Sequence, residues 1–241
     1  MQRRDQPLRV APSPATPLLG RLIPPVAARL IAAEEELTAL DREAGDGDHG
    51  SSMRRGCEAV LAQAERIAAK PLPEALKAIG NILMMNVGGA SGPIYGTLFI
   101  SLGRRLGQEP AARPPDGGLA PAWRDGATRP GCVNERDAFV AAFGHALTDV
   151  RVMGKSDVGS KTLLDVLVPV QRLLAGGGSD LVARARRCAA EAAASTVGMQ
   201  ALRGRASFRG VDSRGHMDPG ARSSQLIVTA VCDELESAAA S

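Results

Sequence analysis

Apolar residues recur at every third or fourth position along most of this 241-residue chain, and glycine or proline interrupts each stretch. This spacing places the apolar side chains on one face of an α-helix. It predicts helices at about residues 18–40, 51–69, 73–85, 94–106, 134–150, 161–174, 180–199 and 219–237. Pro24 and Pro25 are expected to trim the start of the first helix to about residue 25. Eight helices with short connections favour an all-α fold, either an antiparallel up-and-down bundle or a helical barrel.

The composition supports the same fold class. Only six residues are aromatic, while 44% are hydrophobic, so the core must consist of Leu, Ala, Val and Ile. Such a core favours packed helices over a sandwich or barrel of strands. Residues 1–17 hold four prolines and are expected to form a flexible tail, and residues 18–241 a single domain. Residues 107–133, with five prolines and five glycines, are expected to be a long flexible insertion. Asn134 and either Ser179 or Asp180 are expected to cap the helices that follow them.

Several classes of function are disfavoured. The formal charge is only +3, and the arginines are scattered without interleaved aromatic residues, so we expect no nucleic-acid partner. Cys57, Cys132, Cys188 and Cys232 are far apart and form no C-x-x-C pair, which argues against structural zinc and favours reduced thiols. No apolar run reaches membrane length. We therefore expect a cytoplasmic protein without a membrane partner.

Three aspartates lie between glycines at the end of the first helical stretch. If Asp41, Asp46 and Asp48 converge within about 5 Å, each pair of carboxylates repels by about 3 kcal/mol at an effective dielectric constant near 20. A cation must offset this repulsion. Charged oxygen ligands suit a hard divalent ion, and Mg²⁺ completes its octahedron with waters and substrate phosphate oxygens. The segment is thus a candidate magnesium and phosphate site.

The segment also resembles two other glycine-containing motifs. Gly45, Gly47 and Gly50 match G-x-G-x-x-G, but a dinucleotide fingerprint requires a preceding strand and bare amides, and here a helical pattern and acidic residues stand instead. An EF-hand requires glycine at loop position 6 and glutamate at position 12, and neither register provides them. A solvated turn whose aspartates only cap the next helix remains an alternative.

Further polar loops precede helices. The glycine-rich residues 88–92 could bring backbone N–H groups to an anion, or they could simply allow close helix packing. Residues 154–156 and 159–162 resemble a P-loop, but their glycine and lysine spacing is wrong for one. Arg205 could bind phosphate bidentately or lie on the surface. His49 and His216 lie in candidate loops, whereas the pattern around His145 indicates packing.

Four motifs then occur in an order that resembles the DAK2 domain, the nucleotide-binding L subunit of dihydroxyacetone kinase. The first is residues 40–50 with Met53 and Gly56, and the second is residues 88–97. The third is residues 159–165, and the fourth is residues 204–221. The resemblance covers about residues 20–238.

The resemblance implies an eight-helix antiparallel barrel with ATP or ADP at one rim. Two Mg²⁺ ions would be bound by Asp41, Asp46 and Asp48. The residues implied to contact the nucleotide are His49, Gly50, Ser51, Ser52, Ala90, Ser91, Gly154, Leu163, Arg205, Asp218, Pro219 and Gly220. The implied reaction is phosphoryl transfer to a small hydroxyketone, with catalysis mostly by positioning and charge neutralisation.

The resemblance also implies a partner, because the family's substrate is held by a separate K subunit or domain and 241 residues leave no room for one. Some members use ATP directly, and others keep ADP bound and rephosphorylate it from a phosphotransferase-system protein. Whether the chain forms a homodimer is left open. Ser160 and Val211-Asp212 depart from the family pattern, which puts the adenine contacts and the substrate in doubt. A kinase for erythrulose or another small sugar, a fatty-acid kinase module and a nucleotide-binding regulatory subunit are the alternatives.

Overall fold

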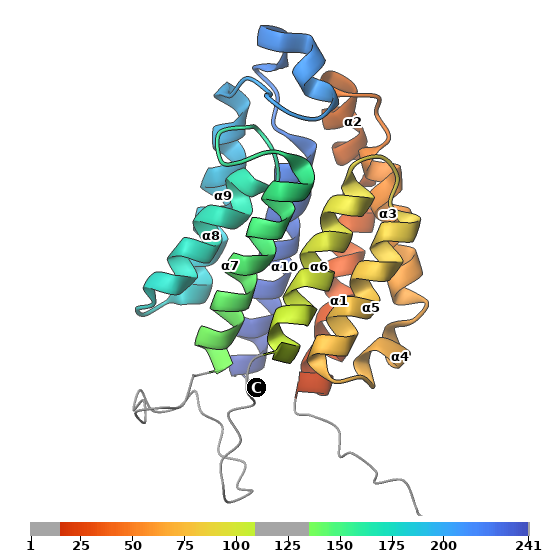
Figure 1. Ribbon diagram of the computed structural model, residues 1–241, viewed down its shortest axis with the longest axis vertical. Helices are drawn as coiled ribbons and strands as arrows, with labels where there is room; N and C mark the ends of the chain where they lie inside the picture. Colours follow the sequence, from red (N-terminus) through yellow and green to blue (C-terminus); the bar gives the residue numbers. More distant parts are fainter. Residues whose placement is uncertain (1–14, 109–134, 241) are drawn as a thin grey trace, which may run out of the picture.

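The computed structural model describes residues 15–108 and 135–240, and within these residues the fold is all-α with long antiparallel helices (Figure 1). The expected fold class is therefore confirmed. The helices are α1 (Ala15–Ala32), α2 (Glu34–Ala44), α3 (His49–Leu61), α4 (Ala64–Ala68), α5 (Leu72–Asn86), α6 (Ser91–Gln108), α7 (Glu135–Gly154), α8 (Leu164–Gly176), α9 (Leu181–Ser195) and α10 (Pro219–Ala240), with 3-10 helices η1 (Thr196–Gly198) and η2 (Arg205–Ser213). Of the expected tail at residues 1–17 and the expected insertion at residues 107–133, residues 1–14 and 109–133 lie outside the described residues, as does the Asn134 cap. Residues 15–17 belong to α1 and residues 107–108 to α6, so these ends of the two predicted segments were wrong.

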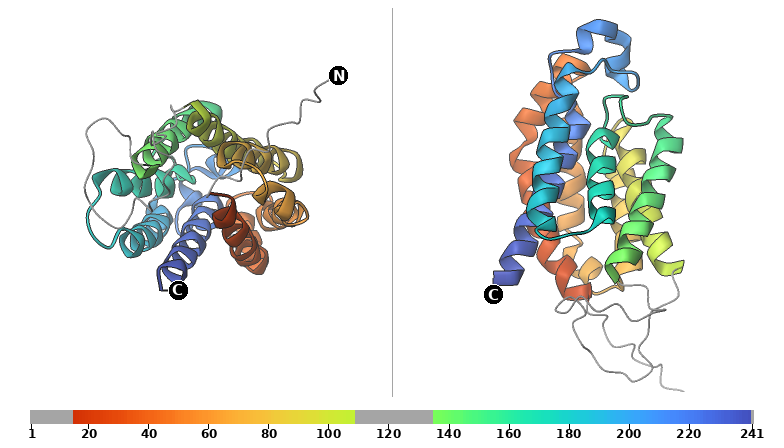
Figure 2. Two further views of the ribbon diagram at one scale, coloured as in Figure 1. Left: turned by 90° about the horizontal axis from the view of Figure 1, so that it is seen from below. Right: turned by 90° about the vertical axis from the view of Figure 1, so that its left-hand side faces the viewer.

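The helices close into a ring. Along the series α1, α3, α5, α6, α7, α8, α9 and α10 each helix packs against the next, and α10 returns to α1. Seen along the helix axes, the ribbons surround a common centre (Figure 2). The interior is filled by aliphatic side chains such as Leu37, Leu76, Ile79 and Leu164. This arrangement fits the low aromatic content, because small and branched side chains pack closely spaced helices.

Two expected helices are broken. The first becomes α1 and α2, separated at Ala33, and the second becomes α3 and α4, separated at Ala62 and Gln63. The described residues therefore contain more helices than the periodicity predicts, although the ring follows the predicted order. The breaks fall where the apolar spacing continues without a glycine or proline, so the sequence pattern carries no signal for them.

The prediction that Pro24 and Pro25 trim the first helix was wrong. Both prolines lie inside α1, which begins at Ala15. An interior proline costs about 3 kcal/mol through its missing N–H and its clash with the preceding turn. Leu19 and Ile23 on the same turns are both buried at 6% exposure, and burying each aliphatic side chain contributes roughly 1.5–3 kcal/mol. Burial of the N-terminal turns thus offsets the cost of the prolines.

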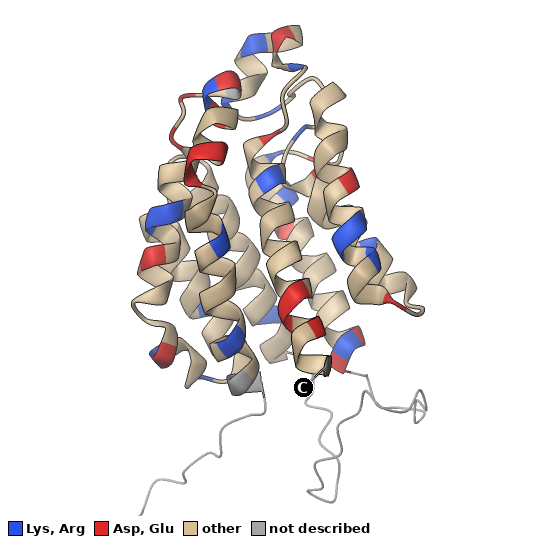
Figure 3. Ribbon diagram, turned by 180° about the vertical axis from the view of Figure 1, so that it is seen from behind, with Lys and Arg blue, Asp and Glu red and all other residues tan. Residues whose placement is uncertain are grey.

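Ion pairs link the outer faces of the ring. Arg29 and Arg186 both pair with Asp233, at 2.8 and 2.9 Å, and so connect α1 and α9 to α10. Figure 3 shows basic and acidic residues interspersed over the helices on one side of the molecule. These half-exposed pairs contribute little individually, about 0–1 kcal/mol each. None of the described helices is long and apolar enough to cross a membrane.

One end of the ring collects the candidate motifs. The helices α2, α5 and α7 end there, and α3, α6, α8 and α10 begin there. We call this end the rim; it comprises residues 45–48, 87–90, 155–163 and 196–218 and lies at the top of Figure 1. Each motif singled out in the sequence therefore reaches the same end of the barrel.

Candidate functional site

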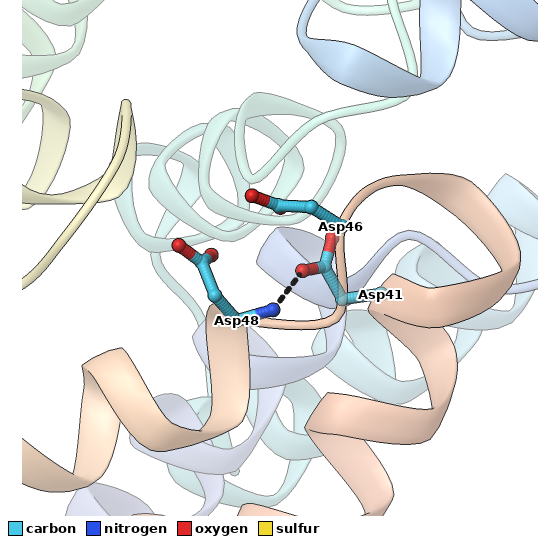
Figure 4. Close-up of side chains that lie close together, drawn as sticks. All are labelled: Asp41, Asp46 and Asp48. Atoms are coloured by element: carbon cyan, nitrogen blue, oxygen red, sulfur yellow. Dashed lines mark hydrogen bonds between the residues drawn. The ribbon is translucent and has the colours of Figure 1, made fainter.

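Asp41 organises the aspartate loop. It lies in the last turn of α2 rather than in the loop itself, because the helix continues to Ala44. Its Oδ2 atom accepts a hydrogen bond from the backbone N–H of Asp48 at 2.8 Å (Figure 4). It accepts a second one from the backbone N–H of His49 at 3.1 Å. Only 9% of Asp41 is exposed. The end of α2 is thereby joined to the start of α3 across the loop.

The three aspartates converge as the sequence predicts. Asp41, Asp46 and Asp48 each offer one carboxylate oxygen, and these oxygens lie within 4.8 Å of one another. Burial raises the pKa of Asp48, and the carboxylates of Asp46 and Asp41 raise it further. Arg205 and Arg55 act in the opposite direction but do not cancel the rise. The cluster thus carries negative charge that its own cations leave incompletely balanced.

The starts of three helices face one another at this cluster. His49 opens α3, Ser91 opens α6, and Ser223 lies in the first turns of α10. The Nδ1 atom of His49 is 3.1 Å from Ser91 Oγ, and its Nε2 atom is 3.0 Å from Ser223 Oγ. Helix N-termini carry partial positive charge and unpaired N–H groups. Their convergence makes this part of the rim suited to an anion such as a phosphate chain.

His49 connects these elements with both ring nitrogens. It is 6% exposed, and burial lowers its pKa to about 4, so the ring is neutral at pH 7. Its backbone N–H already bonds Asp41. The structure therefore gives His49 a role in holding the loops together.

Tyr95, which lies in the second motif, and two serines of α10 extend this network, although none of them was assigned to the site from the sequence. The Tyr95 hydroxyl is 2.8 Å from Ser223 Oγ and 3.0 Å from Ser224 Oγ. Tyr95 is the chain's only tyrosine and is 2% exposed. Its place in the second motif, one turn after the glycine-rich loop, is the signal that could have assigned it to the site.

The glycines of the rim permit close approach. A Cβ on Gly50 would lie 2.1 Å from the Glu34 carbonyl oxygen, and one on Gly92 would lie 2.3 Å from the Val87 carbonyl oxygen. A Cβ on Gly88 would lie 2.8 Å from Ser52 Oγ. In contrast, Gly89 has a positive φ of 61° and no neighbour within 4 Å of its Cβ position. Both interpretations of the glycine-rich loop therefore hold. Gly92 is needed for close helix packing, and Gly89 leaves its backbone open to an anion.

The remaining residues expected near the nucleotide differ in their surroundings. Ser51 Oγ donates to the Asp48 carbonyl at 3.0 Å, and buried Ser52 accepts from Arg55 at 2.9 Å. Ala90 is exposed beside Gly89. The Leu163 side chain is buried, so only its backbone could face a ligand.

Two other expected contacts extend this part of the rim. A Cβ on Gly220 would lie 3.6 Å from Leu163 N, which places the start of α8 beside that of α10. Pro219, the first residue of α10, is buried. Gly154 ends α7, and its Cβ position is 3.9 Å from the Ile94 side chain of α6.

Residues 199–216, which we call the cap, lie over the aspartate loop. The prediction that this stretch is only a loop was incomplete, because it contains η2. Arg205 forms an ion pair with Asp46, and Arg209 donates to the Glu43 carbonyl. A shallow cavity between the cap and the loop is lined by Gly45, Asp46, Arg205, Phe208 and Arg209. Arg205 thus faces the acidic cluster rather than open solvent alone.

Asp218 is the N-cap residue of α10, directly before Pro219. Its Oδ2 accepts from the Ala221 N–H at 2.7 Å. Burial raises its pKa to about 7, against the opposing effects of that hydrogen bond and of Lys161. The folded state therefore favours the protonated carboxyl group, and its contribution to stability is present below about pH 4 and lost as the pH rises through 7.

Asp218→Asn is expected to remove this pH dependence, because asparagine also caps a helix but does not ionise. Relative to the unmodified chain, the free energy of unfolding of the variant should rise by about 1–2 kcal/mol between pH 4.5 and pH 8, after allowing for partial solvent access. Urea unfolding at both pH values, without ligand, measures the difference. Parallel pH profiles of the two proteins would contradict the assignment.

Comparison with known proteins places the chain in a family. The family model described as the DAK2 domain matches residues 43–233. The chain belongs to the DAK2 domain family. The resemblance seen in its four motifs is thereby confirmed, and the match begins two residues after Asp41.

Other DAK2 domain proteins are similar over most of this chain. The ADP-binding subunit DhaL of the PEP-dependent dihydroxyacetone kinase of Escherichia coli K12 is 37% identical over 195 residues, 78% of this chain and 82% of that protein. The D-erythrulose kinase of Mycolicibacterium smegmatis is 33% identical over 90% of this chain but only 35% of its own length.

Two solved structures share the fold of this chain. The native dihydroxyacetone kinase of C. freundii matches 97% of this chain with a TM-score of 0.67 and 23% identity. The same kinase in complex with AMP-PNP and Mg²⁺ matches with a TM-score of 0.66 and 25% identity. This chain spans 37% of the native kinase chain, so it corresponds to about a third of that protein.

Proposed function

We propose that this chain is the nucleotide-binding subunit of a dihydroxyacetone-type kinase, which transfers a phosphoryl group from a nucleotide to a small hydroxyketone held by a separate K-type subunit. The observation that carries the proposal is the convergence of three carboxylate oxygens within 4.8 Å, beside three helix N-termini. A cluster of negative charge next to an anion-binding surface requires a cation between them. Metal-bound phosphate satisfies both sides of the site.

The donor set fits Mg²⁺. All three side chains provide hard oxygen ligands, and neither sulfur nor a free imidazole nitrogen lies in the cluster. Bound Mg²⁺, which we propose as two ions, would offset the charge that develops on the transferring phosphoryl group. Asp41 fixes the loop through two backbone N–H groups, so Asp46 and Asp48 are held in place before any ligand arrives.

The protein's own groups would position the nucleotide. The open backbone at Gly89 and Ala90 and the start of α6 offer N–H groups to phosphate oxygens. Arg205 on the cap provides a planar cation opposite the aspartates. The starts of α8 and α10, at Leu163 and Gly220, would form the adenine side of the pocket. Phosphoryl transfer depends mainly on such positioning and charge neutralisation.

The relatives inform the choice of phosphate donor. Stand-alone relatives of similar length are named ADP-binding subunits of PEP- or PTS-dependent kinases, in Escherichia coli, Listeria innocua and Lactococcus lactis. They favour a bound ADP that is rephosphorylated by a phosphotransferase-system protein. The relative named D-erythrulose kinase keeps a larger acceptor sugar as an alternative. Direct use of ATP is the alternative donor. ADP that stays with the protein through purification supports the first, and activity with ATP alone supports the second.

Exposed apolar side chains at the rim support a K-type partner. Met85 lies in the last turn of α5, Val152 lies near the end of α7, and Phe208 on the cap is 92% exposed. Among the described residues, eight of the nine exposed large hydrophobic side chains lie in these terminal turns or on the rim, and Phe139 is the exception. The acceptor must meet the nucleotide at this end, so the subunit that holds it must dock here. Buried aromatic anchors often dominate such interfaces.

The proposal predicts that dihydroxyacetone is phosphorylated only when a K-type subunit is supplied, whether the donor is Mg·ATP or ADP rephosphorylated by a phosphotransferase-system protein. Phe208→Ser should weaken the apparent affinity for that subunit about tenfold or more, since aromatic anchors often contribute over 1 kcal/mol. Its affinity for the nucleotide should change by less than about threefold. A coupled kinase assay titrated with the K-type subunit, with calorimetry of nucleotide binding, measures both quantities.

Phe139→Ser is the matched control, because Phe139 is also an exposed phenylalanine but lies in the first turns of α7, at the end away from the rim. It should behave like the unmodified chain. Phosphorylation of free dihydroxyacetone by the chain alone would contradict the proposed division between subunits. Equal effects of the two substitutions would contradict docking at the rim.

A further inference from the structure

Lys161 is a buried lysine whose only role so far is its effect on the pKa of Asp218. It lies in the loop between α7 and α8 and is 1% exposed. Its Nζ atom donates to the carbonyl oxygens of Met199, at 3.2 Å, of His216, at 2.7 Å, and of Ser213. Its backbone φ is +61°, a conformation that side-chain-bearing residues seldom adopt. Burying a charged ammonium group and holding a left-handed backbone both cost free energy, so favourable contacts must offset them.

The three carbonyl groups belong to the two ends of the cap. Met199 begins it, and Ser213 and His216 close it. An ammonium group has three N–H donors and no acceptor, so three converging carbonyls satisfy it completely. Backbone bonds support the same closure, since Leu202 N–H donates to the Ser160 carbonyl at 3.1 Å. The Lys161 side chain thus hydrogen-bonds both ends of the cap to the loop before α8.

The pinned segment reaches the candidate phosphate site from two directions. Arg205, near the middle of the cap, pairs with Asp46 of the acidic cluster. His216 accepts a hydrogen bond from Lys161 through its carbonyl oxygen. It lies two residues before Asp218, the N-cap residue of helix α10. We call the two ends of the cap its base. A shift of this base would move both Arg205 and the start of α10.

We propose that Lys161 is a positioning residue that closes the base of the cap and so sets Arg205 and the N-terminus of α10 around the nucleotide phosphates. This role rests on the proposed function for its effect on the nucleotide, but the closure of the cap does not. It also accounts for the motif at residues 159–162, which is no P-loop, since the lysine turns inward to backbone carbonyls.

The test compares Lys161→Met with Lys155→Met. Lys155 lies in the same loop, also has a positive φ, of 47°, but is exposed. Without nucleotide, trypsin should cut Lys161→Met after Arg203, Arg205, Arg209 or Arg214 about tenfold faster than the unmodified chain, because unsatisfied buried carbonyls loosen the cap. Its affinity for Mg·ADP should fall about tenfold, with far-ultraviolet circular dichroism unchanged. Lys155→Met should match the unmodified chain in all three.

A double-mutant cycle separates positioning from general destabilisation. If Lys161 acts through Arg205, Lys161→Met should cost clearly less Mg·ADP affinity in an Arg205→Ala background than alone. Leu76→Ala, in the core of α5, should lower stability but leave the affinity unchanged. Additive losses in the cycle, or an equal loss in Leu76→Ala, would overturn the positioning role.

The outcomes distinguish this inference from the proposed function. A protease-resistant cap in a chain that does not bind Mg·ADP would contradict the proposed function and leave the closure of the cap standing. Unchanged proteolysis in Lys161→Met would overturn the closure. If Lys161→Met does not fold, hydrogen exchange of the unmodified chain decides. The N–H groups of Leu202 and Gly215 donate to the carbonyls of Ser160 and Val197, at 3.1 and 2.8 Å. Slow exchange at both supports the closure, and exchange at the rate of a free peptide overturns it.

Discussion

Replacing Asp48 by asparagine is expected to stabilise the ligand-free protein while lowering its affinity for Mg·ADP about a hundredfold. Burial and the neighbouring carboxylates raise the pKa of Asp48, so its ionised form is disfavoured in the fold. Removing the charge should raise the free energy of unfolding by about 0.5–1 kcal/mol after solvent screening. The same change removes an anionic ligand from a hard cation, which needs it. Urea unfolding in EDTA and calorimetry with Mg·ADP measure the two effects.

The opposite signs are what make this substitution informative. A residue that matters only for folding would lose stability and binding together. Asp137→Asn, an exposed aspartate in the first turn of α7, is the control and should leave nucleotide affinity unchanged. An Asp48→Asn variant that binds Mg·ADP as tightly as the unmodified chain would contradict the metal assignment.

Gly50→Ala is expected to lower the free energy of unfolding by about 3 kcal/mol and to reduce nucleotide affinity at least tenfold, since overpacking forces backbone shifts. The new Cβ would lie 2.1 Å from the Glu34 carbonyl oxygen and 2.8 Å from Thr38 N. Both neighbours are backbone atoms of α2, so α3 must move away from α2. Because Asp41 lies in the last turn of α2 and Asp48 directly precedes α3, that movement separates the proposed metal ligands. Thermal or urea unfolding and calorimetry measure the outcome.

Gly176→Ala is its matched control. Gly176 also lies in a helix, at the end of α8, and nothing lies within 4 Å of its Cβ position. Alanine there should change stability by no more than about 1 kcal/mol, toward stabilisation, since alanine is the better helix former. Similar losses in the two variants would show that the contact between α2 and α3 does not set the site.

The fold class was predictable because helical periodicity is a local property. Apolar residues three and four apart place one face of each helix in the core whatever its neighbours are. The start of α1 was not predictable, because the burial of Leu19 and Ile23 that offsets Pro24 depends on the packed ring. Ser179 and Asp180 also look like caps, yet Asp180 has a φ of 54° and makes no side-chain capping bond. Local chemistry alone did not decide that helix start.

The candidate site, like the fold, was predictable from the sequence only in part. The aspartates lie within eight residues, so their convergence could be inferred from spacing and charge alone. The bond between His49 and Ser223 spans 174 residues, and that between Lys161 and His216 spans 55 residues. Such pairings depend on how the ring closes, which no short motif encodes. For this reason the network of Tyr95 and the cap held by Lys161 were found only in the structure.

Anomalous diffraction from crystals grown with Mn²⁺ and ADP tests the central assignment most directly, because Mn²⁺ accepts the same oxygen ligands as Mg²⁺ and can be located by its scattering. We expect anomalous peaks bounded by the carboxylates of Asp41, Asp46 and Asp48, with the ADP phosphates against the starts of α3 and α6. Ordered ADP bound elsewhere on the chain, with no peak at these three aspartates, would contradict it.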